Sequence, residues 1–355
     1  MQPLARNGRG AASNGEGRFE ALTREAVDDG WALEEEKLPA FETIVRPVQA
    51  KSIVSHNTSP DIGFDQSINP YYGCEHGCIY CYARPSHAYL NLSPGLDFET
   101  KLFYKANAAE LLDAELRRPG HPISTIALGA NTDPYQPIER EHRVTRGILE
   151  VLAKFRHPVG IVTKGVLIER DLDILADLAR DHLVSVGITL TTLDAALKRT
   201  LEPRAASSAA RLKVMRQLAD IGVPVRVMFS PVIPFVNDAE LERVLEAAAA
   251  AGATAASYVL LRLPHEVAPL FREWLETHLP LKAAHVMSLV NQSRGGKDYD
   301  SAWGSRMRGS GEFADLIAQR FRLAMRRHGL DGERIALNRG AFRVPARIGD
   351  QLGLF

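Results

Sequence analysis

Cysteine is scarce in this chain of 355 residues, and the three that occur, Cys74, Cys78 and Cys81, lie within eight residues of one another. An odd number of thiols in one cluster argues against a disulfide framework and favours a reducing compartment, so we expect a cytoplasmic protein. Long apolar runs are also missing, because no stretch approaches the roughly 18 residues that a membrane span needs. The first residues lack the apolar core of a signal peptide. We therefore expect no membrane partner.

The chain has no excess of charge of either sign, since 43 Lys and Arg balance 43 Asp and Glu. Net charge therefore does not select nucleic acid as a partner. The balance shifts locally, because residues 294–347 hold twelve basic and six acidic side chains. Arginines in this segment could follow phosphates, or they could form a solvated basic face. Its stretch "RGGKDYDSAWGSRMRG" could also form a lid over a ligand site.

Short apolar runs alternate with longer amphipathic stretches from residue 124 onward. The runs are 124–130, 158–165, 184–192, 224–234 and 255–264. Runs of this length between Gly, Pro or Asp are typical of strands that are buried on both faces of a parallel sheet. Helical patterns follow at 168–182, 207–222 and 237–252, with two more at 107–120 and 312–327. This alternation predicts an α/β barrel or open sheet, in which the carboxyl ends of the strands line the ligand site.

The cysteines have the spacing C-x3-C-x2-C, which suits a loop wrapped around a metal centre. A structural zinc ion needs four ligands, and His76 or His87 could supply the fourth. A cubane iron–sulfur cluster normally takes four thiolates, so three would leave one iron open to a small molecule. The spacing alone leaves both centres open.

Cys74, Cys78, Tyr80 and Cys81 together form C-x3-C-x-aromatic-C, which resembles the signature of the radical S-adenosylmethionine (SAM) superfamily. The resemblance implies that the three cysteines hold a [4Fe–4S] cluster whose fourth iron binds SAM. An electron from the cluster would then cleave SAM to methionine and a 5′-deoxyadenosyl radical, which abstracts hydrogen from a substrate. It also implies an α/β fold, namely a partial (β/α)6 TIM-like barrel with N- and C-terminal extensions.

A longer pattern resembles one branch of that superfamily, the spore photoproduct lyase-like proteins, often labelled DNA repair photolyases. It consists of "NPYYGCEHGCIYCYAR", "NTDPYQPIE", "TKG" and "SPVIP", and "SLVNQSRGGKDYDSAWGSRMRGSG" further suggests a bacterial subfamily. The resemblance spans about residues 50–330. We expect a flexible extension at 1–50, the radical SAM core at 51–278, a Gly/Arg-rich extension at 279–345 and a mobile tail at 346–355.

The resemblance implies SAM contacts for seven residues: Tyr80, Tyr82, Asn131, Thr132, Asp133, Lys164 and Ser185. Tyr80 would pack near the adenine, residues 131–133 would meet the amino group, and Lys164 would reach the carboxylate. Ser185 would touch the ribose or else be buried and bonded to the backbone. Lys164 could instead be a solvated loop lysine.

One position departs from the lyase pattern, because the lyase returns hydrogen through a cysteine where this chain has Asn131. An amide cannot donate a hydrogen atom in that way, which places the lyase reaction itself in doubt. Tyr135 or Tyr258 could act instead, and the sequence identifies no catalytic residue. Arg226, Tyr258 and Arg262 could line a substrate cavity or simply pair with an acid.

The last five residues, "QLGLF", resemble the short peptide with which bacterial repair proteins bind the DNA sliding clamp. Gln351, Leu352, Leu354 and Phe355 would be its anchors. The tail could instead fold back on its own core.

We therefore predict a cytoplasmic radical SAM enzyme that acts on nucleic acid, with a damaged or modified base in DNA as the leading substrate. The alternatives are modification of a peptide or small metabolite, and a non-catalytic metal-binding module that docks on DNA machinery. A flavodoxin- or ferredoxin-type reductant is implied by the resemblance.

Overall fold

A computed structural model of the chain describes residues 8–19, 42–332 and 336–346. The predicted clamp-binding tail at Gln351–Phe355 lies outside the described residues. No helix among the residues described has the length and apolar character needed to cross a bilayer.

The centre of the molecule is a seven-stranded sheet in the order β10-β9-β8-β7-β6-β3-β2. Its strands are β2 (Val54–His56), β3 (Gln66–Ile68), β6 (Ile126–Leu128), β7 (Val159–Thr163), β8 (Val184–Thr189), β9 (Val225–Val232) and β10 (Ala255–Leu260). Strands β3 and β6 to β10 run parallel, and β2 is an antiparallel edge strand. The six parallel strands confirm the predicted partial barrel.

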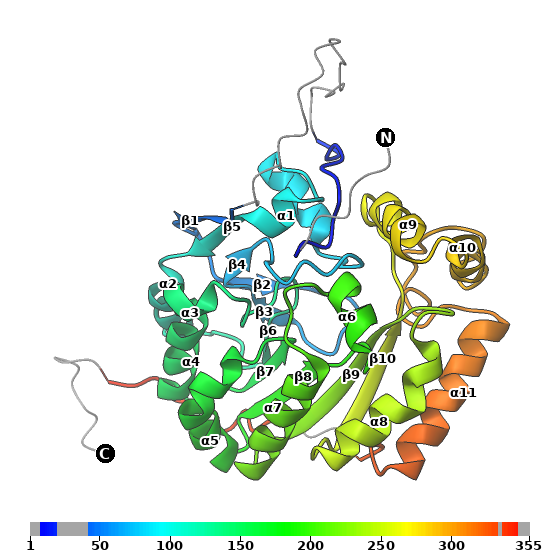
Figure 1. Ribbon diagram of the computed structural model, residues 1–355. Coiled ribbons are helices and arrows are strands. Elements are labelled where there is room, and N and C mark those ends of the chain that lie inside the picture. Colours follow the sequence, from blue (N-terminus) through cyan, green and yellow to red (C-terminus); the bar gives the residue numbers. More distant parts are fainter. Residues whose placement is uncertain (1–7, 20–41, 333–335, 347–355) are drawn as a thin grey trace, which may run out of the picture.

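Helices cover the outer face of this sheet (Figure 1). They are α2 (Ala108–Leu116), α4 (Val144–Lys154), α5 (Leu172–Arg180), α7 (Ser208–Asp220), α8 (Leu241–Ala250) and α11 (Glu312–Arg327). The apolar faces of these helices and of the strands form the main core, which includes Leu149, Leu175, Leu218 and Leu245. Each apolar run predicted as a strand contains one, and the predicted helix at 312–327 matches α11.

Local sequence signals explain where α7 begins and ends. The Ser207 hydroxyl accepts a hydrogen bond from the Ala210 amide at 3.2 Å, as a helix N-cap does. Gly222, with a φ of +80°, follows the helix and turns the chain into β9.

A second layer lies at the carboxyl end of the barrel strands. It contains a small sheet of β1 (Ile44–Val48), β5 (Lys101–Lys105) and β4 (Tyr71–Tyr72). Around it are the helices α1 (Asp97–Thr100), α3 (Glu139–His142), α6 (Ala195–Leu201), α9 (Val267–His278) and α10 (Ala283–Gln292). Short 3-10 turns occur at Arg84–Leu90, Leu167–Asp171 and Asp238–Glu240. The helices α1, α3, α4, α6, α9 and α10 were not predicted from the sequence.

Two parts of the stretch expected to be a flexible extension, residues 1–50, have defined positions. Residues 8–19 lie against the cysteine segment, where Ala11 is buried in a second core with Ile79 and Trp274. Strand β1 pairs in parallel with β5. The sequence did not predict these positions, because the residues that these parts contact lie far along the chain. The local polarity of residues 1–50 gives no indication of such contacts.

Candidate functional site

The three cysteines lie in a loop that follows β4. Cys74 and Cys78 are buried and Cys81 is half-buried, and none forms a disulfide. Backbone hydrogen bonds fix the loop, from the Cys74 amide to the Phe98 carbonyl at 2.9 Å and from the Ile79 amide to the Leu201 carbonyl at 3.1 Å. The thiols are therefore held by contacts to both α1 and α6.

A buried ion pair between Arg84 and Glu99 supports this loop from behind. Arg84 also donates to the carbonyls of Cys78 at 2.9 Å and of Pro94 and Gly95 at 3.0 Å. The Glu99 carboxylate accepts hydrogen bonds from the Gly10 and Ala11 amides, each at 2.9 Å. The N-terminal segment is thus part of the support of the cysteine loop.

The cysteines open onto a cavity of about 1270 Å³ that runs along the inside of the barrel, from the amino ends of its strands at Thr125 and Pro224 to their carboxyl ends at Lys164. Its lining includes all three cysteines and all seven residues predicted to contact SAM: Tyr80, Tyr82, Asn131, Thr132, Asp133, Lys164 and Ser185. Ligand pockets usually measure roughly 300–1,000 Å³. This cavity therefore has room for a cofactor together with part of a substrate.

Tyr80 is anchored by a buried charged network. Its hydroxyl donates to Glu202, which also accepts from the Thr191 hydroxyl at 2.6 Å and pairs with Arg211. Burial opposes ionisation of Glu202, but Arg211 and Lys164 bring the pKa of that carboxyl down to about 2. The network fixes the Tyr80 ring, whose centroid lies 5.9 Å from the Lys164 ammonium.

Lys164 directly follows β7, is half-buried and lines the cavity. Burial opposes its charge, but Cys78 and Glu202 raise the pKa of the ammonium above its ordinary value. Ser185, on β8, lies in register beside Gly160 and is half-buried at the cavity wall. Both side chains can therefore meet a ligand.

Thr132 and Asp133 hold the turn after β6 in place. The Thr132 hydroxyl donates to the Tyr71 carbonyl at 2.9 Å. Asp133 accepts from the Thr163 hydroxyl at 2.6 Å and the Lys164 amide at 2.7 Å. Burial opposes ionisation of Asp133, but His76 and these hydrogen bonds lower its pKa to about 2. This carboxylate therefore joins β6 to β7.

Asn131 and Tyr82 lie at the exposed side of the same turn. The backbone amide of Asn131 donates to the Asn69 side-chain oxygen at 2.8 Å. The side-chain nitrogen of Asn131 donates to the Ser86 hydroxyl at 3.4 Å. The Tyr82 hydroxyl donates to the Ala130 carbonyl. The two side chains frame the cavity between Cys81 and β6.

The histidines considered as zinc ligands have other partners. Burial lowers the pKa of His87 to about 4, and its Nε2 lies 3.0 Å from the Lys101 carbonyl oxygen. His76 faces Asp133, with 3.3 Å between Nδ1 and Oδ2. In the described part of the chain, no three His, Cys, Asp or Glu side chains gather in a group that could hold one metal ion.

Three free thiols on one loop that line one cavity match the donor set of a cluster that would bind each of them through a different iron. Burial raises the pKa of Cys74 well above its ordinary value and that of Cys78 to about 12. A cationic centre is therefore needed to keep them as thiolates. The adjoining cavity supplies space for a chelator at the remaining iron.

The two phenols considered as hydrogen donors occupy different places. Tyr135 is fully buried and does not line the cavity. Tyr258 lines it near β10 and packs against Phe321 of α11, with 4.6 Å between the ring centroids. Arg226 and Arg262 also line the cavity.

Sequence reasoning missed Glu99, Arg84, Glu202 and Arg211, which hold the cysteine loop and Tyr80. No local pattern identifies them, because Glu202 meets Tyr80 across 122 residues of sequence. Gln136 entered the sequence prediction only as part of the motif "NTDPYQPIE". Its side-chain oxygen accepts a hydrogen bond from the Glu75 amide at 2.8 Å, and its side-chain nitrogen donates to the Gly73 carbonyl at 3.2 Å.

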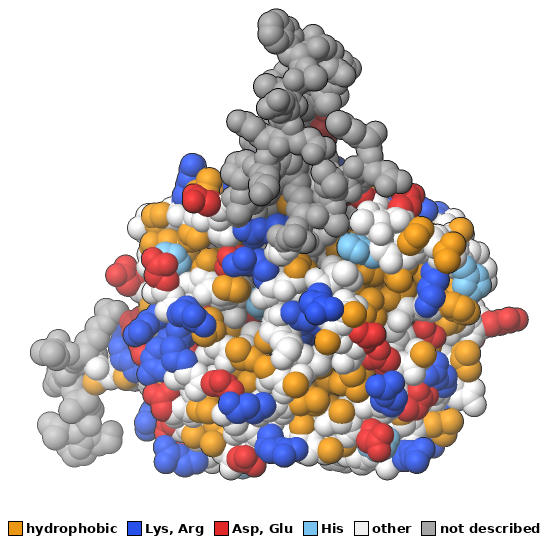
Figure 2. Space-filling view, viewed as in Figure 1, with side chains coloured by type: hydrophobic (Ala, Val, Ile, Leu, Met, Phe, Trp, Pro, Cys, Tyr) orange, Lys and Arg blue, Asp and Glu red, His pale blue; other side chains and the backbone are white. Residues whose placement is uncertain are grey.

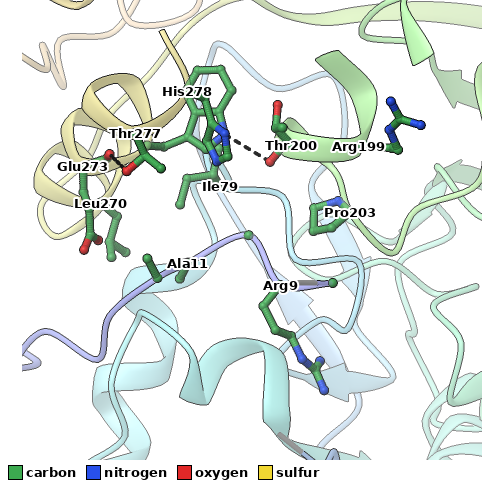
Figure 3. Close-up of a pocket in the computed structure, with 14 residues that line it drawn as sticks. Arg9, Ala11, Ile79, Arg199, Thr200, Pro203, Leu270, Glu273, Thr277 and His278 are labelled. Carbon is green, nitrogen blue, oxygen red and sulfur yellow. Dashed lines mark hydrogen bonds between the residues drawn. The ribbon is translucent and has the colours of Figure 1, made fainter. Parts of the chain in front are cut away.

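A second, smaller cavity of about 380 Å³ lies on the outer side of the cysteine loop (Figure 3). Ile79, the N-terminal segment and α9 form its walls, and the Trp274 indole donates to the Thr200 carbonyl at 3.1 Å. On the face shown in Figure 2, acidic and basic side chains are interspersed, without one large patch of either sign.

Comparisons with known proteins agree with this geometry. The model of the family described as the Radical SAM superfamily matches residues 68–248. An uncharacterised protein of Mycobacterium tuberculosis is 37% identical over 271 residues, which cover 71% of this chain and 80% of that protein. An uncharacterised protein of Methanocaldococcus jannaschii is 29% identical over 193 residues, or 54% of this chain and 69% of the relative.

Solved structures of spore photoproduct lyase share the fold. One variant superposes with a TM-score of 0.60 at 12% identity, covering 81% of this chain and 80% of the lyase. The lyase in complex with dinucleoside spore photoproduct gives a TM-score of 0.59 at 13% identity, covering 80% and 79%. At this level of identity the likeness concerns the fold alone.

Proposed function

We propose, from the premise that this chain belongs to the radical SAM superfamily, that it is an enzyme that generates a substrate radical. Cys74, Cys78 and Cys81 would hold a [4Fe–4S] cluster, and SAM would bind in the adjoining cavity. When bound, the cluster would supply the electron that cleaves SAM to methionine and a 5′-deoxyadenosyl radical. The observation that carries the proposal is the single cavity that joins the three thiols to all seven predicted SAM contacts.

The residues of the chain divide this work between contact and positioning. In this proposal Lys164 would meet the SAM carboxylate, Asn131 would meet the amino group, and Ser185 would meet the ribose. Tyr80 and Tyr82 would pack against the cofactor. Thr132 and Asp133 are positioning residues in this proposal, because their oxygens are engaged by the protein.

The substrate class that we propose is nucleic acid, with a damaged or modified base in DNA as the reacting group. It is supported by arginines that line the cavity and by the fold shared with a lyase whose structure holds a dinucleoside photoproduct. A flavodoxin- or ferredoxin-type protein would deliver the electron in the cytoplasm. Binding of the tail to a sliding clamp stays a prediction.

The test is the formation of 5′-deoxyadenosine by anaerobically reconstituted protein under dithionite, measured by liquid chromatography with iron and sulfide contents. We expect product from the wild type, and neither cluster nor product from Cys74→Ala. Lys164→Ala should keep its iron but bind SAM more weakly, which separates loss of the cluster from loss of SAM. Full iron content and undiminished product in Cys74→Ala would refute the assignment.

A further inference from the structure

The large cavity has a strong excess of positive charge along its described lining. Its cations are Lys164, Arg226, Arg262, Arg306, Arg308 and Arg339, whereas its carboxylates are Asp61 and Asp133. Asp133 is bonded within the turn after β6. A cavity with low-dielectric walls and charge of one sign concentrates ligands of the opposite sign.

Three of these cations form what we call the arginine mouth: Arg262, which follows β10, and Arg306 and Arg308, in the segment before α11. Arg306 donates from Nε to Asp61 at 2.7 Å, and the Gly304 amide donates to the same carboxylate at 2.8 Å. The Leu260 amide donates to the Met307 carbonyl at 2.9 Å. These bonds tie the segment to β10 on one side and to the loop before β3 on the other, so they fix the Arg306 side chain and the backbone next to Arg308.

Arg262 is held as an isolated cation between two aromatic rings. Its guanidinium carbon lies 5.4 Å from the Tyr82 ring centroid and 5.6 Å from that of Tyr299. It donates to the Tyr299 hydroxyl at 3.1 Å and to the Met307 sulfur at 3.3 Å, while its Nε has no partner. Among the described residues, no carboxylate pairs with it. The rings pre-orient the planar group, which reduces the entropy lost when it binds a ligand.

Arg308 is a second cation that pairs with no acidic side chain in the described parts of the chain. Its guanidinium carbon lies 5.0 Å from the Tyr258 ring centroid. Arg262 and Arg308 therefore border the same cavity without an acidic partner among the described residues, and this arrangement suits an anion with several oxygens.

We propose that Arg262 and Arg308 bind a phosphate ester of the substrate at the arginine mouth. This assignment of the anion to a substrate rests on the function proposed above. Tyr82 directly follows Cys81, so Arg262 lies beside the cysteine loop, and a phosphate held there places the attached nucleoside next to the proposed SAM site. The SAM carboxylate is assigned to Lys164, which leaves the two arginines for a different anion. A phosphodiester has two non-bridging oxygens that share one negative charge, and each of them can accept hydrogen bonds from a guanidinium group.

The experiment measures binding rather than turnover, with the reconstituted full-length protein saturated with SAM. The probes are the dinucleoside monophosphate TpT, its uncharged methylphosphonate analogue and thymidine 5′-monophosphate, each studied by equilibrium dialysis. We expect TpT to bind about tenfold or more tightly than the analogue. Arg308→Ala and Arg262→Gln should each remove most of that difference and leave binding of the analogue unchanged. Tighter binding of the monophosphate would support a terminal phosphate as the group recognised.

The control is Arg322→Ala, which removes the same charge from an exposed position on α11. Equal binding of TpT and its analogue to the wild type would overturn the proposal. So would a loss of SAM affinity in Arg262→Gln and Arg308→Ala, because the arginines would then belong to the cofactor site. Arg308 is exposed, so its variant decides the question even if Arg262→Gln fails to fold. Charge-dependent binding of TpT without any 5′-deoxyadenosine would refute the proposed function and leave the phosphate site.

Discussion

Replacing Glu202 by glutamine tests whether the buried charged network holds the cavity wall. The variant leaves Arg211 buried without its carboxylate and weakens the acceptor of the Tyr80 hydroxyl. Loss of one partner of a buried ion pair costs roughly 3–5 kcal/mol. The pKa of Glu202 falls from 4.5 to about 2 in the folded chain, which independently corresponds to about 3 kcal/mol.

We expect the lower end of that range, because Arg211 also donates to the carbonyls of Ala206 and Thr189, each at 3.0 Å. The measurement is the free energy of unfolding of the metal-free chain in urea at pH 7. Glu276→Gln, at an exposed position of α9, is the control and should change stability by less than about 0.5 kcal/mol. The double variant Glu202→Leu with Arg211→Met should lose less free energy of unfolding than Glu202→Gln, since it leaves no unpaired buried charge.

The pH dependence gives a second check on the same pair. Because the folded pKa of Glu202 is lowered, its stabilisation is present above pH 4.5 and is lost as the pH falls toward 2. The difference between wild type and Glu202→Gln should therefore shrink below pH 4.5. The reasoning would be refuted if Glu202→Gln lost less than about 1 kcal/mol of unfolding free energy at pH 7. It would also be refuted if the difference in stability between wild type and variant did not change with pH.

Two further predictions concern the N-terminal segment and a buried histidine. Gly10→Ala should lower the iron retained after reconstitution, because the added Cβ would lie 1.8 Å from the Gly77 carbonyl oxygen. The control is Gly15→Ala, where an added Cβ would meet nothing within 4 Å. Equal iron contents in the two variants would contradict the role of the N-terminal segment in supporting the cysteine loop. Burial lowers the pKa of His157 from 6.5 to about 4, so the unfolded chain takes up the proton first and stability should fall by roughly 1–3 kcal/mol between pH 6.5 and 4. His157→Phe should flatten that part of the urea-derived stability profile, and an unchanged slope would count against a neutral buried imidazole.

Local sequence patterns were sufficient to predict five of the six parallel barrel strands and the cysteine loop, whereas β3 (Gln66–Ile68) lies outside the predicted runs. Apolar runs bounded by Gly, Pro or Asp contain β6 to β10, because burial on both faces dictates their composition. The family resemblance then pointed to Asn131 and Lys164, and both follow strands whose carboxyl ends lie at one edge of the sheet. The positions of residues 8–19 and the pairing of Glu202 with Arg211 could not be predicted, because both depend on contacts between segments whose own patterns are ordinary.

The structure also narrows how a reaction in this cavity can end. All three cysteines of the chain are assigned to the proposed cluster, and Asn131 stands where the sequence resemblance leads us to expect the lyase thiol. Tyr135 is buried away from the cavity, and the Tyr80 hydroxyl is committed to Glu202. The phenols of Tyr82 and Tyr258 lie at the described cavity wall, and the Tyr82 hydroxyl donates to the Ala130 carbonyl. In the proposed reaction, a hydrogen atom returned by a side chain of this wall would therefore come from an O–H rather than an S–H bond.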